Sequence, residues 1–104
     1  MYLILYTRQG CCLCKGLEER IEKLSLQKLV PPLRLVIIDI DSNDASDKEK
    51  KQYEFQVPVL SIGFDDQNER FALPRVSPRL TGEQLFAWLQ KSVANLLETL
   101  STDT

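Results

Sequence analysis

The sequence predicts an α/β domain with the element order β-α-β-α-β-β-α, in which a four-stranded mixed sheet has helices on both faces. Three observations lead to this prediction. A short apolar run at 2–6 and a second at 33–40 flank a helical segment, which indicates two parallel strands joined by a right-handed crossover. Two later short runs flank a polar turn, which indicates an antiparallel hairpin. A last amphipathic helix closes the chain.

The bulk composition limits the size and the class of the protein. A chain of 104 residues is long enough for one domain with one core, and we expect a single domain over residues 1–100 and a frayed tail over 101–104. A hydrophobic content of 43% and a charged content of 27% predict a globular protein. The net charge of -2 gives no reason to expect nucleic acid as a partner. Because the sequence contains neither a membrane-length apolar stretch nor the features of a signal peptide, we expect a cytoplasmic protein with no membrane contact.

The first half of the chain provides two strands and one helix. Residues 2–6 are apolar and β-prone, and they predict a buried strand. A helix is expected from about residue 12 to about residue 28, ended by Pro31 and Pro32, and its apolar face consists of Leu13, Leu17, Ile21 and Leu24. Residues 33–40 contain the continuous apolar run 35–38, which suits a strand covered on both faces.

The second half provides a short helix, a hairpin and a long helix. Ser46 and Glu49 match a capping box, which predicts a helix from there through Tyr53. Residues 57–62 and 69–73 are the predicted hairpin strands, with a turn at 63–68 and a loop at 74–80. Thr81 and Gln84 form a second capping box, and the helix that follows has an apolar stripe made of Leu85, Leu89, Val93, Leu96 and Leu100.

Three cysteines lie where the first strand gives way to the first helix. Cys11 and Cys14 form a C-x-x-C pair, and Cys12 lies between them. Thiols three positions apart on a first helical turn can close a disulfide, and a helix N-terminus favours the reactive thiolate. Such a cluster in a reducing compartment is more often catalytic or metal-binding than structural. The chain has no histidine, which excludes a histidine base and a Cys/His zinc site.

The segment 6–14, Tyr-Thr-Arg-Gln-Gly-Cys-Cys-Leu-Cys, and the pair Val57-Pro58 together resemble the thioredoxin superfamily, most closely the glutaredoxins. The order of elements is similar over about residues 2–98, so the resemblance implies a thioredoxin-like fold. Typical glutaredoxins have Pro and Tyr where this chain has Cys12 and Leu13. They also have Gly-Gly and acidic residues where this chain, over 74–83, has a single glycine. The chain is therefore similar to the divergent glutaredoxin-like proteins.

The resemblance implies a thiol–disulfide oxidoreductase that reduces protein disulfides or glutathione mixed disulfides by a dithiol mechanism. Cys11 would be the nucleophile, and Cys14 would resolve the mixed disulfide. The family places a cis peptide bond before Pro58, which would let the backbone of Val57 pair with an extended substrate. No tightly bound cofactor or metal is expected, and glutathione is a candidate reductant. The expected partners are a disulfide-containing protein or glutathione, and we expect a monomer.

Each of three arginines and the middle cysteine has a functional and a non-functional interpretation. Arg8, three residues before Cys11, can lower the pKa of the thiol or bind a substrate carboxylate, or it can be a solvated surface residue. In the family, the loop of Arg75 and Arg79 borders the active site, so both are candidates for binding an anionic ligand, although solvated arginines are the more common case. Cys12 is read as a tolerated spacer in preference to a third redox or metal thiol.

Two other functions remain open from the residues alone. The cysteine cluster could supply thiolates to zinc or, across a dimer with glutathione, to an iron–sulfur cluster, although a closed zinc site usually has four ligands. Alternatively, the domain could be a non-catalytic binding module of the same fold. The retention of both motif cysteines favours the oxidoreductase over this module.

Overall fold

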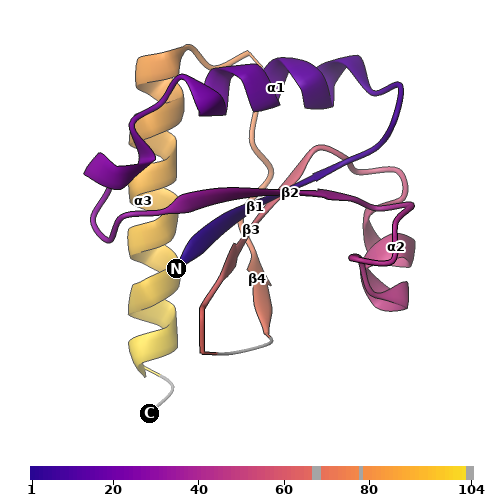
Figure 1. The fold of residues 1–104 in the computed structure, drawn as a ribbon. Helices are drawn as coiled ribbons and strands as arrows, with labels where there is room; N and C mark the ends of the chain where they lie inside the picture. Colours follow the sequence, from indigo (N-terminus) through magenta and orange to yellow (C-terminus); the bar gives the residue numbers. More distant parts are fainter. Residues whose placement is uncertain (67–68, 78, 103–104) are drawn as a thin grey trace.

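A computed structural model describes residues 1–66, 69–77 and 79–102 (Figure 1). The elements follow the predicted order β-α-β-α-β-β-α, with one additional 3-10 turn. They are β1 (Tyr2–Thr7), α1 (Cys12–Glu22), η1 (Leu26–Lys28), β2 (Arg34–Asp39), α2 (Asp47–Tyr53), β3 (Val59–Gly63), β4 (Arg70–Ala72) and α3 (Gly82–Thr102). The strands form one mixed sheet in the order β2-β1-β3-β4, which confirms the predicted fold class.

The central strand of the sheet is β1. It pairs in parallel with β2 and antiparallel with β3, and β4 pairs antiparallel with β3 at the far edge. In this register Leu5 lies opposite Ile37 on one side and Leu60 on the other. Residues 3–6 of β1 are completely buried, because the strand has a neighbour on each side and helices over each face.

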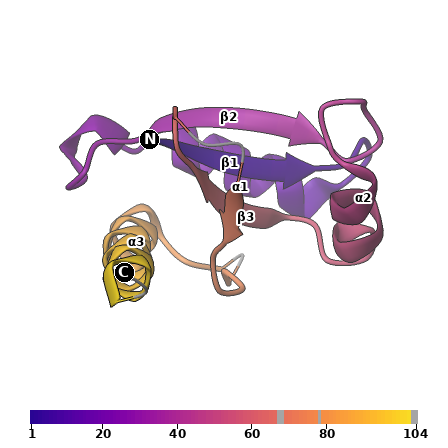
Figure 2. The same cartoon turned by 90° about the horizontal axis from the view of Figure 1, so that it is seen from below.

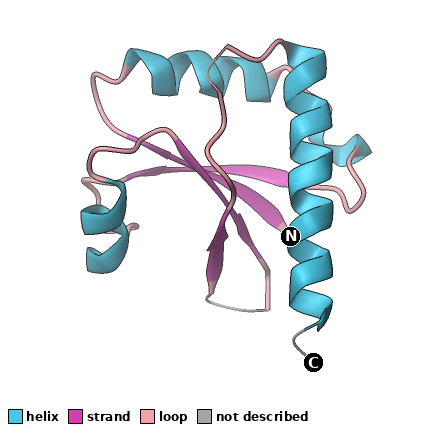
Figure 3. Cartoon of the chain, turned by 180° about the vertical axis from the view of Figure 1, so that it is seen from behind, coloured by secondary structure: helices cyan, strands magenta, loops and turns pink. Residues whose placement is uncertain are grey.

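Helices cover both faces of the sheet, as predicted. One face packs against α1 and α3 through the side chains of Leu3, Leu5, Leu17, Ile21, Leu85 and Leu89. The other face packs against α2 and the segment before it through Ile4, Tyr6, Ile38, Ala45 and Tyr53. Figure 2 shows α3 and α2 at opposite sides of the sheet, and Figure 3 shows the same layers from behind. The alternation of β1 side chains between the two cores fixes the register of the sheet.

The first helix is shorter than the sequence predicts. The expected span of 12–28 is wrong, because α1 ends at Glu22 and the backbone leaves the helical region at Ser25 (φ -87°, ψ 79°). The chain then makes the short turn η1, and Leu26 of this turn and Leu29 directly after it are buried in the main core. Burial of these two leucines therefore ends the helix well before Pro31, the residue expected to stop it.

The strand β2 is not covered on both faces, contrary to the prediction. Val36 is 38% exposed and Ile37 is 43% exposed. These side chains are exposed because β2 is an edge strand, with β1 as its neighbour in the sheet, and the helices do not cover all of it. A continuous apolar run predicts a strand but does not tell a central strand from an edge strand.

Both predicted capping boxes are present. Glu49 N–H donates to Ser46 Oγ at 3.1 Å, and Ser46 N–H donates to Glu49 Oε1 at 2.9 Å. Thr81 and Gln84 exchange the equivalent bonds at 3.1 and 3.4 Å. The helix α3 continues through Thr102, and residues 103–104 of the predicted tail lie outside the described residues, as do residues 67–68 of the predicted turn. Over the part of the chain that the structure describes, no helix has the length and apolarity to cross a membrane.

Candidate active site

The cysteine motif lies at the junction of β1 and α1. Gly10 has a positive φ of 83°, a conformation that glycine adopts without strain, and it turns the chain from the strand towards the helix. Cys11 is the N-cap residue of α1, where its Sγ accepts a hydrogen bond from the Cys14 N–H at 3.2 Å. The Cys11 N–H donates to the Arg8 carbonyl at 3.1 Å. The sulfur of Cys11 therefore sits where the unpaired N–H groups of the helix stabilise negative charge.

Cys11 and Cys14 form a disulfide, with their Cα atoms 5.2 Å apart. Cys14 is only 2% exposed, whereas Cys11 is half-buried. Both line a groove of about 370 Å³ together with Thr7, Arg8, Gly10, Cys12, Lys15 and Glu18. An incoming sulfur can therefore reach Cys11 more easily than Cys14.

The two residues inside the motif face solvent. Cys12 is exposed and not part of a disulfide. Leu13 is 57% exposed, so the prediction that it belongs to the apolar face of the helix is wrong. Cys12 shares the groove with the disulfide pair, so the oxidised protein retains one accessible thiol beside it. Among the residues that the structure describes, no group of three or more His, Cys, Asp or Glu side chains is placed to hold a metal ion.

The side chain of Arg8 reaches the loops on either side of α2. Its Nε and Nη2 atoms donate to the two carboxylate oxygens of Asp41 at 3.1 and 3.4 Å. Its Nη1 atom donates to the Glu54 carbonyl at 3.1 Å. The cation thus lines the redox groove and is paired with a carboxylate.

Val57 and Pro58 lie at the same end of the sheet as Cys11. Val59 at the start of β3 pairs with Tyr6 near the end of β1, and the peptide bond between Val57 and Pro58 is cis. Pro58 lines a second hollow of about 130 Å³ between α2 and the loop before α3.

The two candidate arginines of the loop before α3 differ in position. Arg75 lines the hollow beside Pro58, and no other charged side chain of the described residues lines it. Arg79 is exposed and lines neither this hollow nor the redox groove. The structure therefore places Arg75, but not Arg79, in the hollow that Pro58 lines.

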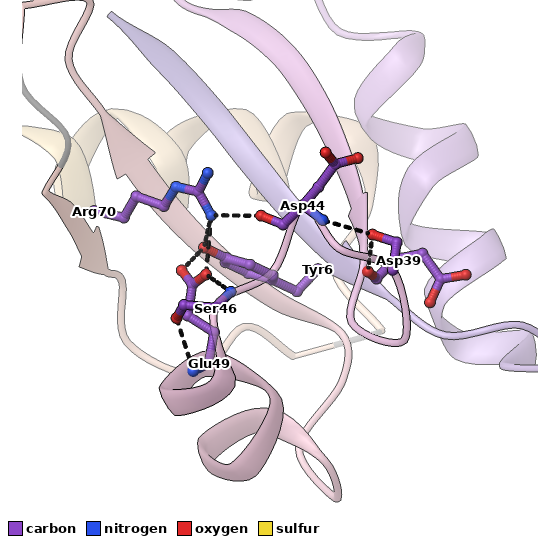
Figure 4. A network of polar contacts seen from close by, with 7 residues as sticks. Tyr6, Asp39, Asp44, Ser46, Glu49 and Arg70 are labelled. Carbon is purple, nitrogen blue, oxygen red and sulfur yellow. Dashed lines mark hydrogen bonds and ion pairs between the residues drawn. The ribbon is translucent and has the colours of Figure 1, made fainter.

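A polar network that the sequence did not predict joins α2 to the sheet (Figure 4). The Tyr6 O–H donates to Glu49 Oε2. Arg70 Nη1 donates to Glu49 Oε1 at 2.9 Å, to the Tyr6 oxygen at 3.4 Å and to the Asp44 carbonyl at 3.4 Å. Three residues far apart in sequence thus connect β1, α2 and β4. One signal was available in the sequence, because a tyrosine at a buried strand position usually requires a polar partner for its hydroxyl.

The network shifts two ionisation equilibria. Burial, followed by the hydrogen bond to Glu49, raises the pKa of Tyr6 above its ordinary value. Burial opposes ionisation of Glu49, but hydrogen bonds from Tyr6 and Ser46 and the charge of Arg70 outweigh it, so the pKa of Glu49 is lowered. The network therefore holds Glu49 as a carboxylate and Tyr6 as a neutral donor.

Comparisons with known proteins agree with this architecture. The chain is similar to a solved malarial protein, with a TM-score of 0.57 and 15% identity over 88% of this chain and 94% of that one. It is also similar to thioredoxin 1 of the thermophilic eubacterium Thermosipho africanus TCF52B, with a TM-score of 0.56 and 15% identity over 90% and 96% of the two chains. At this identity the likeness shows the thioredoxin fold alone. No curated protein matches the chain. The model of the glutaredoxin-like domain family (DUF836) matches residues 2–90, and the chain therefore belongs to this glutaredoxin-like family.

Proposed function

We propose that this protein is a thiol–disulfide oxidoreductase that reduces a disulfide of a protein, or a mixed disulfide with glutathione. The observation that supports this proposal is the pairing of a half-exposed N-cap cysteine, Cys11, with a buried cysteine, Cys14, in one disulfide. A reachable sulfur can attack a substrate, and a shielded sulfur reacts only with its partner. The fold family contains enzymes of this kind, and the site has the two thiols that the reaction needs.

The reaction begins with the reduced protein. The Cys11 thiolate attacks one sulfur of the substrate disulfide, so that a Cys11–substrate bond forms and the other substrate sulfur leaves as a thiolate. The Cys14 thiol then loses its proton and attacks Cys11 Sγ, which closes the disulfide and releases the second substrate thiolate. Two electrons pass from the protein to the substrate, and both leaving thiolates take up protons from solvent. A dithiol or two molecules of glutathione must then reduce the protein again.

The surroundings of the cysteines suggest how a substrate binds. The backbone of Val57 would pair with an extended substrate strand, and Arg75 would meet an anionic group beside Pro58. Arg79 would lie outside this hollow, and its positive charge would attract anionic substrates to this side of the protein. We propose that the protein works as a monomer in the cytoplasm without a tightly bound cofactor, because the cytoplasm supplies the reductants that the cycle needs.

Reduction of 2-hydroxyethyl disulfide and of insulin by the purified protein tests this function. We expect Cys11→Ser to abolish turnover, because the attacking sulfur is gone. Cys14→Ser should slow turnover of the protein disulfide and accumulate a mixed disulfide on Cys11, which mass spectrometry would detect. Cys12→Ser is the matched control, since it removes an exposed thiol of the same groove, and it should retain activity. Turnover that survives Cys11→Ser would refute the proposed function.

A further inference from the structure

Arg8 ties the turn before Cys11 to the loops on both sides of α2. All three nitrogens of its guanidinium have an acceptor: Asp41 receives two hydrogen bonds in a bidentate arrangement, and the Glu54 carbonyl receives the third. Bidentate pairs between arginine and carboxylate are among the stronger and more directional polar contacts in proteins. The pair therefore fixes the direction of the Arg8 side chain.

Both ends of this connection are anchored. The Asp41 N–H donates to Asp39 Oδ1 at 2.8 Å, which holds Asp41 against the last residue of β2. At the other end, the Arg8 carbonyl accepts the Cys11 N–H at 3.1 Å. A continuous set of contacts thus runs from the end of β2 through Asp41 and Arg8 to the nucleophilic cysteine. Arg8 thus links the end of β2, through its side chain, to the turn that carries the N-cap cysteine, through its carbonyl.

The paired Arg8 cation also borders the groove of the cysteines. Arg8 lines the redox groove with Cys11, and it also lines a hollow of about 170 Å³ on the other side, with Asp41. The charged groups that face Arg8 and the groove are Lys15 and Glu18 of α1, Lys50 and Lys51 of α2, Glu54 and Asp41. Asp41 is the carboxylate that contacts the guanidinium directly, so it offsets the Arg8 cation where that cation would otherwise act on Cys11.

On the basis of the function proposed above, we propose that Asp41 is a positioning residue of the redox site. Through its bidentate pair with Arg8 it holds the turn that presents Cys11, and it withholds the Arg8 charge from the Cys11 sulfur. The proposal assigns a role to a residue of the β2–α2 loop, outside the cysteine motif.

Alkylation of the reduced protein by iodoacetamide tests the proposal, with modification of Cys11 followed by mass spectrometry across pH in a Cys12→Ser background. Asp41→Asn frees the Arg8 cation, which favours the thiolate, so Cys11 should be alkylated about three- to tenfold faster at pH 6. Arg8→Gln removes the cation and should show no such gain. The double variant Arg8→Gln/Asp41→Asn should also lose the gain, since the effect of Asp41 acts through Arg8. Asp41→Glu keeps the carboxylate and should stay within about twofold of the parent.

A second arginine–aspartate pair provides a matched control. Arg34 Nη2 donates to Asp65 Oδ1 at 3.0 Å on the surface. Arg34 is at the start of β2, whereas Asp41 follows its end, so this pair lies at the far end of the sheet from the cysteines. Arg34→Gln and Asp65→Asn should leave the alkylation profile of Cys11 unchanged.

Two results would overturn the proposal. One is an Asp41→Asn profile equal to that of the parent, and the other is a gain that persists when Arg8 is also replaced. Asp41 has a side chain that is 55% exposed, so the variant should fold, and thermal unfolding checks this separately. Alkylation does not require turnover. A parent protein that reduces neither test disulfide would therefore refute the proposed function whatever the profile of Asp41→Asn.

Discussion

Removal of a single oxygen atom from the partly buried network of Tyr6, Glu49 and Arg70 tests whether that network stabilises the fold. In Tyr6→Phe the ring keeps its volume and its contact with the Tyr53 ring, whose centroid is 4.9 Å away. The variant loses the donor to the Glu49 carboxylate and the acceptor for Arg70. Glu49 still receives Arg70 and the Ser46 N–H on its other oxygen, so the charge does not become unpaired.

The size of the effect follows from the charge on the acceptor. A hydrogen bond to a charged group contributes about 1.5–3 kcal/mol to the free energy of unfolding, and Tyr6 is fully buried, so we expect a loss of about 2 kcal/mol. A domain of this length has an unfolding entropy of about 0.2 kcal/mol per kelvin, so the melting temperature should fall by about 9 °C.

The loss of stability in Tyr6→Phe should depend on pH. The folded-state pKa of Glu49 lies below its unfolded value, so its contribution is present above the unfolded pKa and is lost as the pH falls through the folded pKa. The Tyr6 hydroxyl helps to lower that pKa. The stability difference between the wild type and Tyr6→Phe should therefore be largest at pH 7 and should shrink towards about 1 kcal/mol in acid, where the acceptor is neutral.

Guanidinium denaturation followed by the fluorescence of Trp88 measures these differences from pH 7 down to about pH 3. Tyr53→Phe is the matched control, because Tyr53 packs on Tyr6 but its hydroxyl has no hydrogen-bond partner among the described residues. We expect it to change the free energy of unfolding by less than about 0.5 kcal/mol. A Tyr6→Phe protein as stable as the wild type at pH 7, or a difference that grows on acidification, would refute this reasoning.

Three further substitutions test local packing and capping by the same denaturation assay. Gly63→Ala should destabilise by about 1–3 kcal/mol, because a Cβ there would overlap the ring of Tyr2; a neutral effect would show that the ring moves aside at little cost. Ser61→Ala should be neutral or stabilising, since the buried Ser61 hydroxyl has no hydrogen-bond partner in the described structure, and a loss above about 1 kcal/mol would contradict this. Ser46→Ala should cost about 1 kcal/mol by removing the cap of α2, whereas Ser46→Asp should retain it.

The local elements of this protein follow from short-range features of the chain. The capping residues Ser46 and Thr81 mark the starts of two helices because their side chains bond to backbone groups three positions away. The cysteine motif predicted the strand–helix junction because Gly10 and Cys11 fit the turn and the N-cap that such a junction requires. The alternative of a metal site was left open by the cysteine spacing, because thiolates serve both chemistries.

Features that depend on distant contacts were predicted less well. The predicted end of the first helix was wrong, because the burial of Leu26 and Leu29 in the common core outweighs local helix propensity. The exposure of Val36 and Ile37 was missed because an apolar run does not specify which strand lies at the sheet edge. The sequence left open whether Arg8 acts at the site or is a solvated surface residue. Its partner Asp41 lies 33 positions away in the chain, so only the tertiary structure shows the pair.

The sequence by itself determined the element types, the fold class and the two thiols of the candidate site, since periodicity, capping and the C-x-x-C spacing act within a few residues. The tertiary structure alone decided which thiol is shielded, where the Arg8 charge is directed and how Tyr6, Glu49 and Arg70 meet. These outcomes depend on the packing of strands and helices that are distant in the chain. Burial and charge pairing are properties of that packing, and no local pattern encodes them.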